Sequence, residues 1–482
     1  MIGEWKILQT AYTACKENHV DENMVRRDEY MVHYGKTLAL AMALVLAFSA
    51  VGCTTQKDET SAEAQPQLWV VDNAKDPQEG YVMENPSASG DLLTPVTVKN
   101  LGNSRTSSEV KKEDPEEVKA IWLSYLDLKP MLLTTGDKSV GEEQFTKNIS
   151  EAFDNIKALG LNTVIAQVRP FGDALYESDI FPWSYLAAGT EGKDPGFDPL
   201  EIMVEQAHKK GLRLEAWVNP YRVRNSATNQ ELSAENPVHA MLKTGDAIKY
   251  NGATSYNPAS EEAQKLIADG VQEIVENYDV DGIHFDDYFY PTTDTAFDAK
   301  DYQAYQKNGG KLSLAQWRRE NVNSLIRKVY SVIKAEDEDI VFGISPQGNM
   351  DNNYNNQFID VKEWLTEDGY IDYICPQIYF GFQNSACPYE ETVEAWNDLI
   401  QNDVKLYVGL APYKIGLEDT FAGNGKWEWA NNDDLLARMV ETAREEDHYQ
   451  GFSLFRYDSV FKPQSDVKSD VKQELENLKD VL

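Results

Sequence analysis

Short apolar segments alternate with amphipathic helical segments from residue 118 to the end of the chain, and this alternation restricts the fold more than any other feature. The predicted strands are 121–128, 162–170, 213–220, 281–287, 340–349, 371–380, 405–414 and 451–458. The predicted helices are 142–159, 198–210, 259–277, 313–335, 359–367, 388–401, 433–446 and 467–481. Strict alternation implies parallel strands, and eight strand–helix units favour closure. We therefore predict an α/β fold, a (β/α)8 TIM barrel.

Several classes of protein are disfavoured by composition and by missing motifs. The formal net charge of −35 argues against a nucleic-acid partner, because phosphate contacts need clustered Lys and Arg. No glycine-rich phosphate loop follows the first predicted strand, so a dinucleotide-binding fold is not indicated. The four cysteines fit neither a zinc-ligand spacing nor a disulfide framework. We expect no cofactor and no metal.

The N-terminal region carries a targeting signal. Residues 37–50 form an apolar stretch, TLALAMALVLAFSA, which is short for a bilayer span and follows Lys36. The stretch leads through small residues to Cys53, a pattern that resembles the bacterial lipoprotein signal. An ordinary signal peptide or a short membrane anchor is the alternative. We expect lipidation at Cys53 and an extracytoplasmic protein that is anchored to a bacterial membrane.

The following segment, residues 54–115, is rich in Ser, Thr, Glu, Asp, Lys and Pro and shows little periodicity. This composition is typical of a flexible linker. The predicted organisation is therefore an extension and lipoprotein signal over 1–53, a flexible linker over 54–115, and a catalytic barrel over 116–482.

Polar and aromatic side chains gather where the predicted strands end, which is the end at which barrels of this type carry their active sites. The candidates for contact with a ligand are Arg169, Asn219, Tyr221, Arg222, His284, Tyr290, Gln347, Gln377, Tyr379, Tyr413 and Arg456. Aromatic rings can stack on the apolar faces of pyranose rings. Candidates for such stacking are Trp122, Trp183, Tyr221, Tyr290, Tyr379, Tyr413, Trp427 and Trp429.

The fourth predicted strand, DGIHFDD, carries the sharpest cluster. Because side chains alternate along a strand, Asp286 shares a face with His284, and Asp287 lies at the strand end. Two adjacent carboxylates in unequal environments can hold one proton between them. Glycoside cleavage needs this division, with an acid for the leaving oxygen and a carboxylate for the positive charge that develops. A calcium or magnesium site, or a carboxylate held by Arg222 or Arg169, is the structural alternative.

A second catalytic acid is less clearly marked. Asp458, after the last predicted strand, is the best candidate because it can face the fourth strand across the rim, whereas Glu215 and Asp173 are weaker candidates. The seventh strand carries no acid, so the common two-glutamate arrangement is not visible. Cleavage in which an N-acetyl group of the substrate acts as the nucleophile stays open.

Long motifs in this region resemble the glycosyl-hydrolase-like 10 family, over about residues 117–460. The matching segments are AIWLSYLDL, NTVIAQVRPFGDALYES, LEAWVNPYRV, DGIHFDDYFYP, FGISPQGN, DYICPQIYF and VGLAPYKIG. The resemblance implies hydrolysis of a cell-wall or related N-acetylhexosamine-containing polysaccharide, since similar lipoproteins cleave peptidoglycan strands that lack stem peptides. It also implies that Asp286 and Asp287 are catalytic, and that the cleft is lined by Asn219, Arg222, Gln377 and Tyr379.

The leading hypothesis is thus a monomeric, endo-acting glycoside hydrolase whose partner is a polysaccharide. Two other hypotheses stay open. One is a non-catalytic glycan-binding lipoprotein on the same barrel. The other is a metal-dependent polysaccharide deacetylase, for which the sequence shows no obvious Asp-His-His ligand set.

Overall fold

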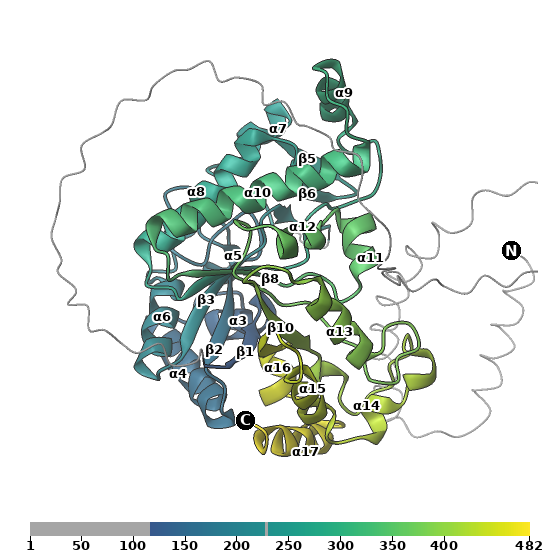
Figure 1. Cartoon of the computed structure of the whole chain (residues 1–482). Coiled ribbons are helices and arrows are strands. Elements are labelled where there is room, and N and C mark those ends of the chain that lie inside the picture. Colours follow the sequence, from purple (N-terminus) through teal and green to yellow (C-terminus); the bar gives the residue numbers. More distant parts are fainter. Residues whose placement is uncertain (1–115, 227–229) are drawn as a thin grey trace, which may run out of the picture. The chain divides into compact units, whose positions relative to one another are not determined.

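Eight parallel strands close into one barrel in the computed structural model, which describes residues 116–226 and 230–482 (Figure 1). The strands are β1 (Val118–Leu123), β2 (Thr163–Arg169), β3 (Arg213–Val218), β7 (Gly282–Phe285), β8 (Val341–Ile344), β9 (Tyr373–Ile374), β10 (Lys405–Leu410) and β11 (Tyr449–Leu454). Their order around the barrel is β1-β11-β10-β9-β8-β7-β3-β2, and the first strand pairs with the last. The predicted (β/α)8 TIM barrel is confirmed.

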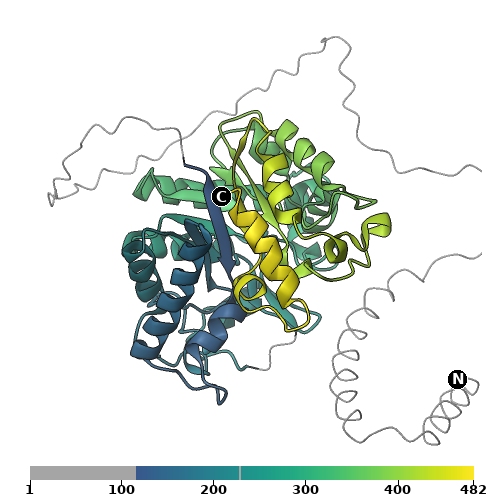
Figure 2. The same cartoon turned by 90° about the horizontal axis from the view of Figure 1, so that it is seen from below.

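The eight predicted helices are also present, close to their predicted bounds. They are α4 (Glu142–Leu159), α6 (Pro199–Lys209), α8 (Glu261–Asn277), α10 (Leu314–Glu336), α12 (Val361–Thr366), α13 (Tyr389–Leu399), α15 (Leu435–Ala443) and α17 (Lys468–Lys479). Local chemistry sets their starts: the Asp198 carboxylate caps α6, and a capping box of Ser313 and Gln316 starts α10. The helices surround the strands, and the C-terminal α17 (yellow) ends near β1 (dark blue) (Figure 2).

Five strands, β1, β8, β9, β10 and β11, end four to six residues earlier than the apolar pattern predicts, and an α-helix follows two of them, β1 and β11, within three residues. Strand β1 ends at Leu123 because Ser124 and Asp127 form a capping box that starts helix α3 (Tyr125–Leu132). In the same way, β11 ends at Leu454 and a short helix, α16 (Tyr457–Phe461), follows. The apolar residues after these two strands therefore lie on helices, which bend the chain across the rim of the barrel.

The connection from β3 to β7 contains a small sheet that the sequence does not predict. Its order is β4-β6-β5, with antiparallel pairs, and its strands are β4 (Arg222–Arg224), β5 (Ala247–Tyr250) and β6 (Ala253–Tyr256). Helix α7 (Val238–Thr244) precedes β5 in this connection, and helix α9 (Ala299–Lys307) follows β7. These insertions lie on the side of the barrel where active sites form.

The core has two layers. Inside the barrel, a cluster contains Val118, Ala120, Trp122, Ile165, Trp217, Tyr373, Cys375 and Tyr407. The opposite faces of the strands pack on the helices, where Ile283 and Phe285 belong to the larger apolar cluster. Cys375 is a buried free thiol. No helix in the described part of the chain has the length and apolarity that crossing a bilayer requires.

Candidate active site

A pocket of about 300 Å³ opens at the carboxyl ends of the barrel strands. It is lined by Trp122, Ser124, Tyr125, Leu126, Gln167, Trp217, Arg222, Asp286, Asp287, Tyr288, Ser345, Gln377, Tyr379, Tyr413 and Phe455. Asp286 and Asp287 are the only two carboxylates among these described lining residues. A pocket of this size, apolar in most of its wall and with a few convergent polar groups, is typical of a small-molecule or sugar site.

Asp286 follows strand β7 and faces the barrel mouth, as strand alternation predicts. Its side chain accepts hydrogen bonds from Asn219 Nδ2 and, at 3.1 Å, from the backbone N–H of Tyr288. The residue is only 3% exposed. Burial raises the pKa of the Asp286 carboxyl to about 7; nearby Arg222 lowers this pKa, and the charge of Asp287 raises it. Asp286 is thus a carboxylic acid that can hold its proton near neutral pH.

The orientation of Asn219 is fixed by a chain of amides that starts at the backbone. The N–H of Tyr125 donates to Gln167 Oε1 at 2.9 Å, and Gln167 Nε2 donates to Asn219 Oδ1 at 2.6 Å. Because a backbone N–H can only donate, the first bond sets the orientation of the Gln167 amide, and Gln167 sets that of Asn219. Asn219 must therefore turn its NH2 group towards Asp286.

Asp287 is held differently, by two neutral amides from neighbouring strand ends. Gln347 Nε2 donates to Oδ2 at 3.0 Å, and Gln377 Nε2 donates to Oδ1 at 3.1 Å. Gln347 is itself oriented by the Asn352 side chain, whose Nδ2 donates to Gln347 Oε1 at 3.0 Å. Each oxygen of the Asp287 carboxyl group thus accepts one amide N–H. The pair therefore has unequal environments: Asp286 is buried, whereas Asp287 is partly exposed and is held by two side-chain amides.

His284 lies beneath the pocket and does not line it. Its Nδ1 contacts the Tyr373 hydroxyl at 2.7 Å, while its Nε2 accepts from Trp122 Nε1 at 3.2 Å and contacts Ser345 Oγ at 2.9 Å. Because the Tyr373 hydroxyl donates to Glu215, its oxygen must accept from His284, so Nδ1 carries the proton. Burial lowers the pKa of His284 to about 3. This neutral ring holds two floor residues, Trp122 and Ser345, rather than contacting a ligand.

Aromatic rings form the rim of the pocket. Tyr288 is 52% exposed, and the Arg222 guanidinium lies 4.3 Å from its ring centroid. On the other side, Tyr379 and Tyr413 meet edge to face at 5.8 Å, and Phe455 contacts both rings. These rings offer stacking surfaces on both sides of the carboxylate pair.

Six predicted residues line the pocket, namely Arg222, Asp286, Asp287, Gln377, Tyr379 and Tyr413, and so does the predicted aromatic Trp122. Asn219 and Gln347 lie behind the two carboxylates that they hold. Ser124, Tyr125, Leu126, Trp217, Ser345 and Phe455 also line it, although none of them was predicted to contact a ligand. Gln167 is marked only by its place at a strand end.

Three predicted contact residues are buried away from the pocket, so that prediction is corrected for them. Arg169 packs over Phe181 at 4.3 Å, because the register of β2 against β3 shifts after Gln167. Tyr221 is 1% exposed and packs against Phe289. Tyr290 lies between Phe297 and Phe358, and its hydroxyl accepts from Asn321 at 3.2 Å.

The predicted second acid, Asp458, also lies outside this pocket. Together with Arg456 it lines a neighbouring cavity, and the two side chains are 3.7 Å apart. Asp458 does not line the pocket because the chain turns into α16 directly after Arg456. The weaker candidates, Glu215 and Asp173, are completely or almost completely buried.

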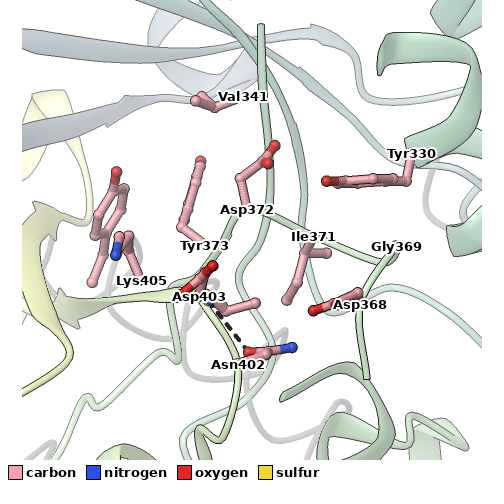
Figure 3. Close-up of a pocket in the computed structure, with 12 residues that line it drawn as sticks. Tyr330, Val341, Asp368, Gly369, Ile371, Asp372, Tyr373, Asn402, Asp403 and Lys405 are labelled. Carbon is pink, nitrogen blue, oxygen red and sulfur yellow. Dashed lines mark hydrogen bonds between the residues drawn. The ribbon is translucent and has the colours of Figure 1, made fainter. Parts of the chain in front are cut away.

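A further cavity, of about 480 Å³, lies at the opposite end of the barrel, where β8, β9 and β10 begin (Figure 3). Its wall contains Asp368, Asp372 and Asp403, and Asp372 pairs with Lys334 at 2.8 Å. In the part of the chain that the structure describes, no group of three or more His, Cys, Asp or Glu side chains is placed to hold a metal ion. The carboxylate pair lies at the end where barrels of this fold carry their active sites, and it is the best candidate for chemistry.

The buried acidic state of Asp286 has a consequence for stability. Because its pKa is raised in the folded state, the fold keeps this proton up to about pH 7 whereas the unfolded chain loses it near pH 4. The contribution of this group to the free energy of unfolding therefore falls as pH rises through that window. The free energy of unfolding of Asp286→Asn minus that of the wild type should therefore increase between pH 5 and pH 8. We expect this increase to be roughly 1–3 kcal/mol.

Urea unfolding at both pH values measures this difference. Asp403→Asn, which changes an exposed carboxylate at the other end of the barrel, is the control, and its difference from the wild type should not depend on pH. An Asp286→Asn difference that is equally constant would contradict the buried proton.

The fold and the site together define a class: a (β/α)8 barrel hydrolase with an acid–carboxylate pair at the end of its fourth barrel strand. The chain belongs to the glycosyl hydrolase-like 10 family, whose sequence profile matches residues 117–428, and it is a glycoside hydrolase. It is 31% identical over 383 residues to glycosyl hydrolase YngK of Bacillus subtilis, a match that covers 75% of this chain and 72% of the relative. It is 33% identical over 383 residues to glycosyl hydrolase DigH of Escherichia coli, covering 73% and 86%.

Among solved structures, the glycoside hydrolase domain of PgaB from Bordetella bronchiseptica is similar, with a TM-score of 0.44 and 14% identity. The match covers 76% of this chain and 99% of that chain.

Proposed function

We propose that this protein hydrolyses the glycan of a cell-wall or related N-acetylhexosamine-containing polysaccharide, with denuded peptidoglycan as the first substrate to test. The observation that carries the proposal is the pair of unequal carboxyl groups in an open pocket: Asp286 is buried, which raises its pKa to about 7, and Asp287 is held by two amide donors. Such a pair supplies the acid and the anion that glycoside cleavage needs. The pocket holds one guanidinium, of Arg222, beside the two carboxyl groups, and its rings suit the apolar face of a pyranose.

The roles follow from the two environments. Asp286 donates its proton to the glycosidic oxygen as the bond from C1 to that oxygen breaks. We assign the role of nucleophile to the acetamido oxygen of the substrate, which closes on C1 to form an oxazolinium ion and leaves Asp287 to stabilise the charge. Asp287 accepts the acetamido N–H and stabilises the positive charge. Water then attacks C1 and returns a proton to Asp286, which restores the acetamido group.

The location follows from the N-terminal signal. We propose that the chain is exported and anchored through a lipid on Cys53, with the linker of residues 54–115 carrying the barrel to its substrate. Cys53 and this linker lie outside the described residues. Labelling with a radioactive fatty acid, in the wild type and in Cys53→Ala, tests the anchor.

Incubation of the full chain with peptidoglycan strands, with and without stem peptides, tests the reaction. We expect mass spectrometry to show sugar fragments from the strands, and we expect no cleavage of strands whose acetamido groups have been removed, because the nucleophile is then missing. Cleavage of the de-N-acetylated strands would contradict the substrate-assisted step. Binding of the strands without any release of fragments would indicate a glycan-binding protein instead.

A further inference from the structure

A second cavity, of about 370 Å³, continues the active-site pocket along the rim of the barrel. The two cavities share Tyr413 and Phe455. The rest of the second cavity is formed by the turn after β10, by α16 and by the segment that leads into α17, which contribute Leu417, Arg456, Asp458 and Ser459 among others. We call this cavity the rim subsite.

We propose that the rim subsite binds further sugar residues of the polysaccharide chain whose bond is cleaved beside Asp286 and Asp287. This inference rests on the proposed function and deepens it, because it makes the rate of cleavage depend on the length of the glycan chain. A linear polymer that lies in the active-site pocket must leave it somewhere. Tyr413 and Phe455 form the wall that belongs to both cavities, so a chain that passes this wall enters the rim subsite directly.

The chemistry of the rim subsite suits a pyranose. Large apolar side chains are exposed there, with Tyr413 at 42% and Leu417 at 46%, and they offer a surface for the C–H face of a sugar ring. Arg456, Asp458 and Ser459 supply donors and acceptors for ring hydroxyls. Exposure of apolar groups next to such polar groups is a common sign of a binding surface.

Charge favours a neutral ligand over a free anion. Asp458 lies 3.7 Å from Arg456 and 3.9 Å from Lys462, and the buried Asp127 also pairs with Arg456. The two cations that line the subsite therefore face two lining carboxylates, Asp458 and Asp466, in addition to Asp127, so no surplus of positive charge is left for an anion. A sugar hydroxyl can use the remaining donors of the guanidinium, whose described ion pairs both go through Nη1.

The two cavities are also held in a fixed relation by one buried carboxylate. Asp127, which is completely buried, accepts from Ser124 Oγ at 2.7 Å, and Ser124 lines the active-site pocket. The same carboxylate accepts from the backbone N–H of Asp458 at 2.9 Å and pairs with Arg456, and both of these residues line the rim subsite. The subsite is thus built before a ligand arrives, which lowers the cost of binding.

Filling the subsite tests the inference. Ser459 lies in α16 and lines the rim subsite but not the active-site pocket, so Ser459→Trp should block the subsite and spare the catalytic pair. Ser465→Trp, at an exposed position in the following loop that lines neither cavity, is the matched control. The substrates are denuded glycan strands of two, four, six and eight sugars.

For the wild type and Ser465→Trp, we expect kcat/KM to rise with chain length. For Ser459→Trp, we expect the shortest cleaved strand to be cut normally and strands of six or eight sugars to lose about tenfold in kcat/KM, equivalent to about 1.4 kcal/mol. If Ser459→Trp does not fold by circular dichroism, Leu417→Asp replaces it with the same expectation, since Leu417 also lines only the rim subsite.

Other outcomes overturn the inference in distinguishable ways. An equal loss on strands of every length, or no loss on any, shows that the rim subsite does not bind the chain. A wild type that cuts all lengths at one rate overturns the subsite and leaves the proposed function standing. A wild type that cuts no strand overturns the proposed substrate, and the inference fails with it.

Discussion

Replacement of Asp286 by Asn is expected to reduce kcat/KM for glycan hydrolysis by roughly 10²- to 10⁴-fold, the usual contribution of a general acid. The amide keeps the size of the carboxyl and can still accept a hydrogen bond, so the barrel should stay folded. It cannot give a proton to the leaving oxygen. Initial rates on denuded strands, measured beside the unfolding curves of the same variant, separate lost chemistry from lost structure.

A substrate with a better leaving group tests whether Asp286 is the general acid. In a nitrophenyl glycoside the leaving group is nitrophenolate, which departs without being protonated. Asp286→Asn should therefore lose much less activity on this substrate than on the glycan. Asp287→Asn should lose activity on both substrates, because the charge at C1 and the acetamido group need the anion in each case. If the two variants show the opposite pattern, the roles of the two residues are exchanged. If neither variant is impaired, the chemistry lies elsewhere.

The barrel could be predicted from sequence because its signal is repeated. Each strand is short and apolar, each helix carries its own periodicity and caps, and eight repetitions leave few alternative folds. The elements that were not predicted are those in which one local interaction overrides the apolar pattern. The capping box of Ser124 and Asp127 ends β1 early, and the sheet of β4, β5 and β6 forms in a long connection without clear strand periodicity.

The site was predicted where strand alternation alone decides the direction of a side chain. Asp286 follows this rule, and Asp287 lines the same pocket because the strand has already ended before it. Arg169 breaks it, because a register shift after Gln167 turns its side chain to the helices, and no residue pattern marks that shift. The prediction for Asp458 was wrong because the predicted last strand ran to residue 458, whereas β11 ends at Leu454 and α16 begins at Tyr457. The amides that hold the two acids come from distant segments, so only the folded chain brings them together.

The loop that follows Asp286 and Asp287 is anchored by a buried ion pair between Arg318 of α10 and Asp298. The guanidinium and the carboxylate are 1% and 0% exposed, and they meet in two hydrogen bonds, Nε to Oδ2 at 2.9 Å and Nη2 to Oδ1 at 2.6 Å. Nη2 also donates to the backbone carbonyl of Asp294 at 2.7 Å. The guanidinium packs against two rings, 5.3 Å from Tyr290 and 4.8 Å from Phe358.

Replacement of Arg318 by Met should therefore cost about 3–5 kcal/mol in the free energy of unfolding, because it keeps much of the apolar packing and leaves Asp298 buried without its counter-charge. Denaturant unfolding measures this loss. Arg438→Met is the control: Arg438 pairs with Asp434 at 3.0 Å on a partly exposed helix surface, where a pair of this spacing contributes about 0.3–0.5 kcal/mol.

The double variant Arg318→Met with Asp298→Leu identifies the cause of the loss. If the uncompensated charge is responsible, removal of Asp298 should restore much of the stability, because well-packed apolar groups can replace a buried ion pair. If the double variant stays as unstable as Arg318→Met, the loss comes from the hydrogen bonds to the loop backbone. A loss in Arg318→Met no larger than that in Arg438→Met would show that the pair does not anchor the loop at all.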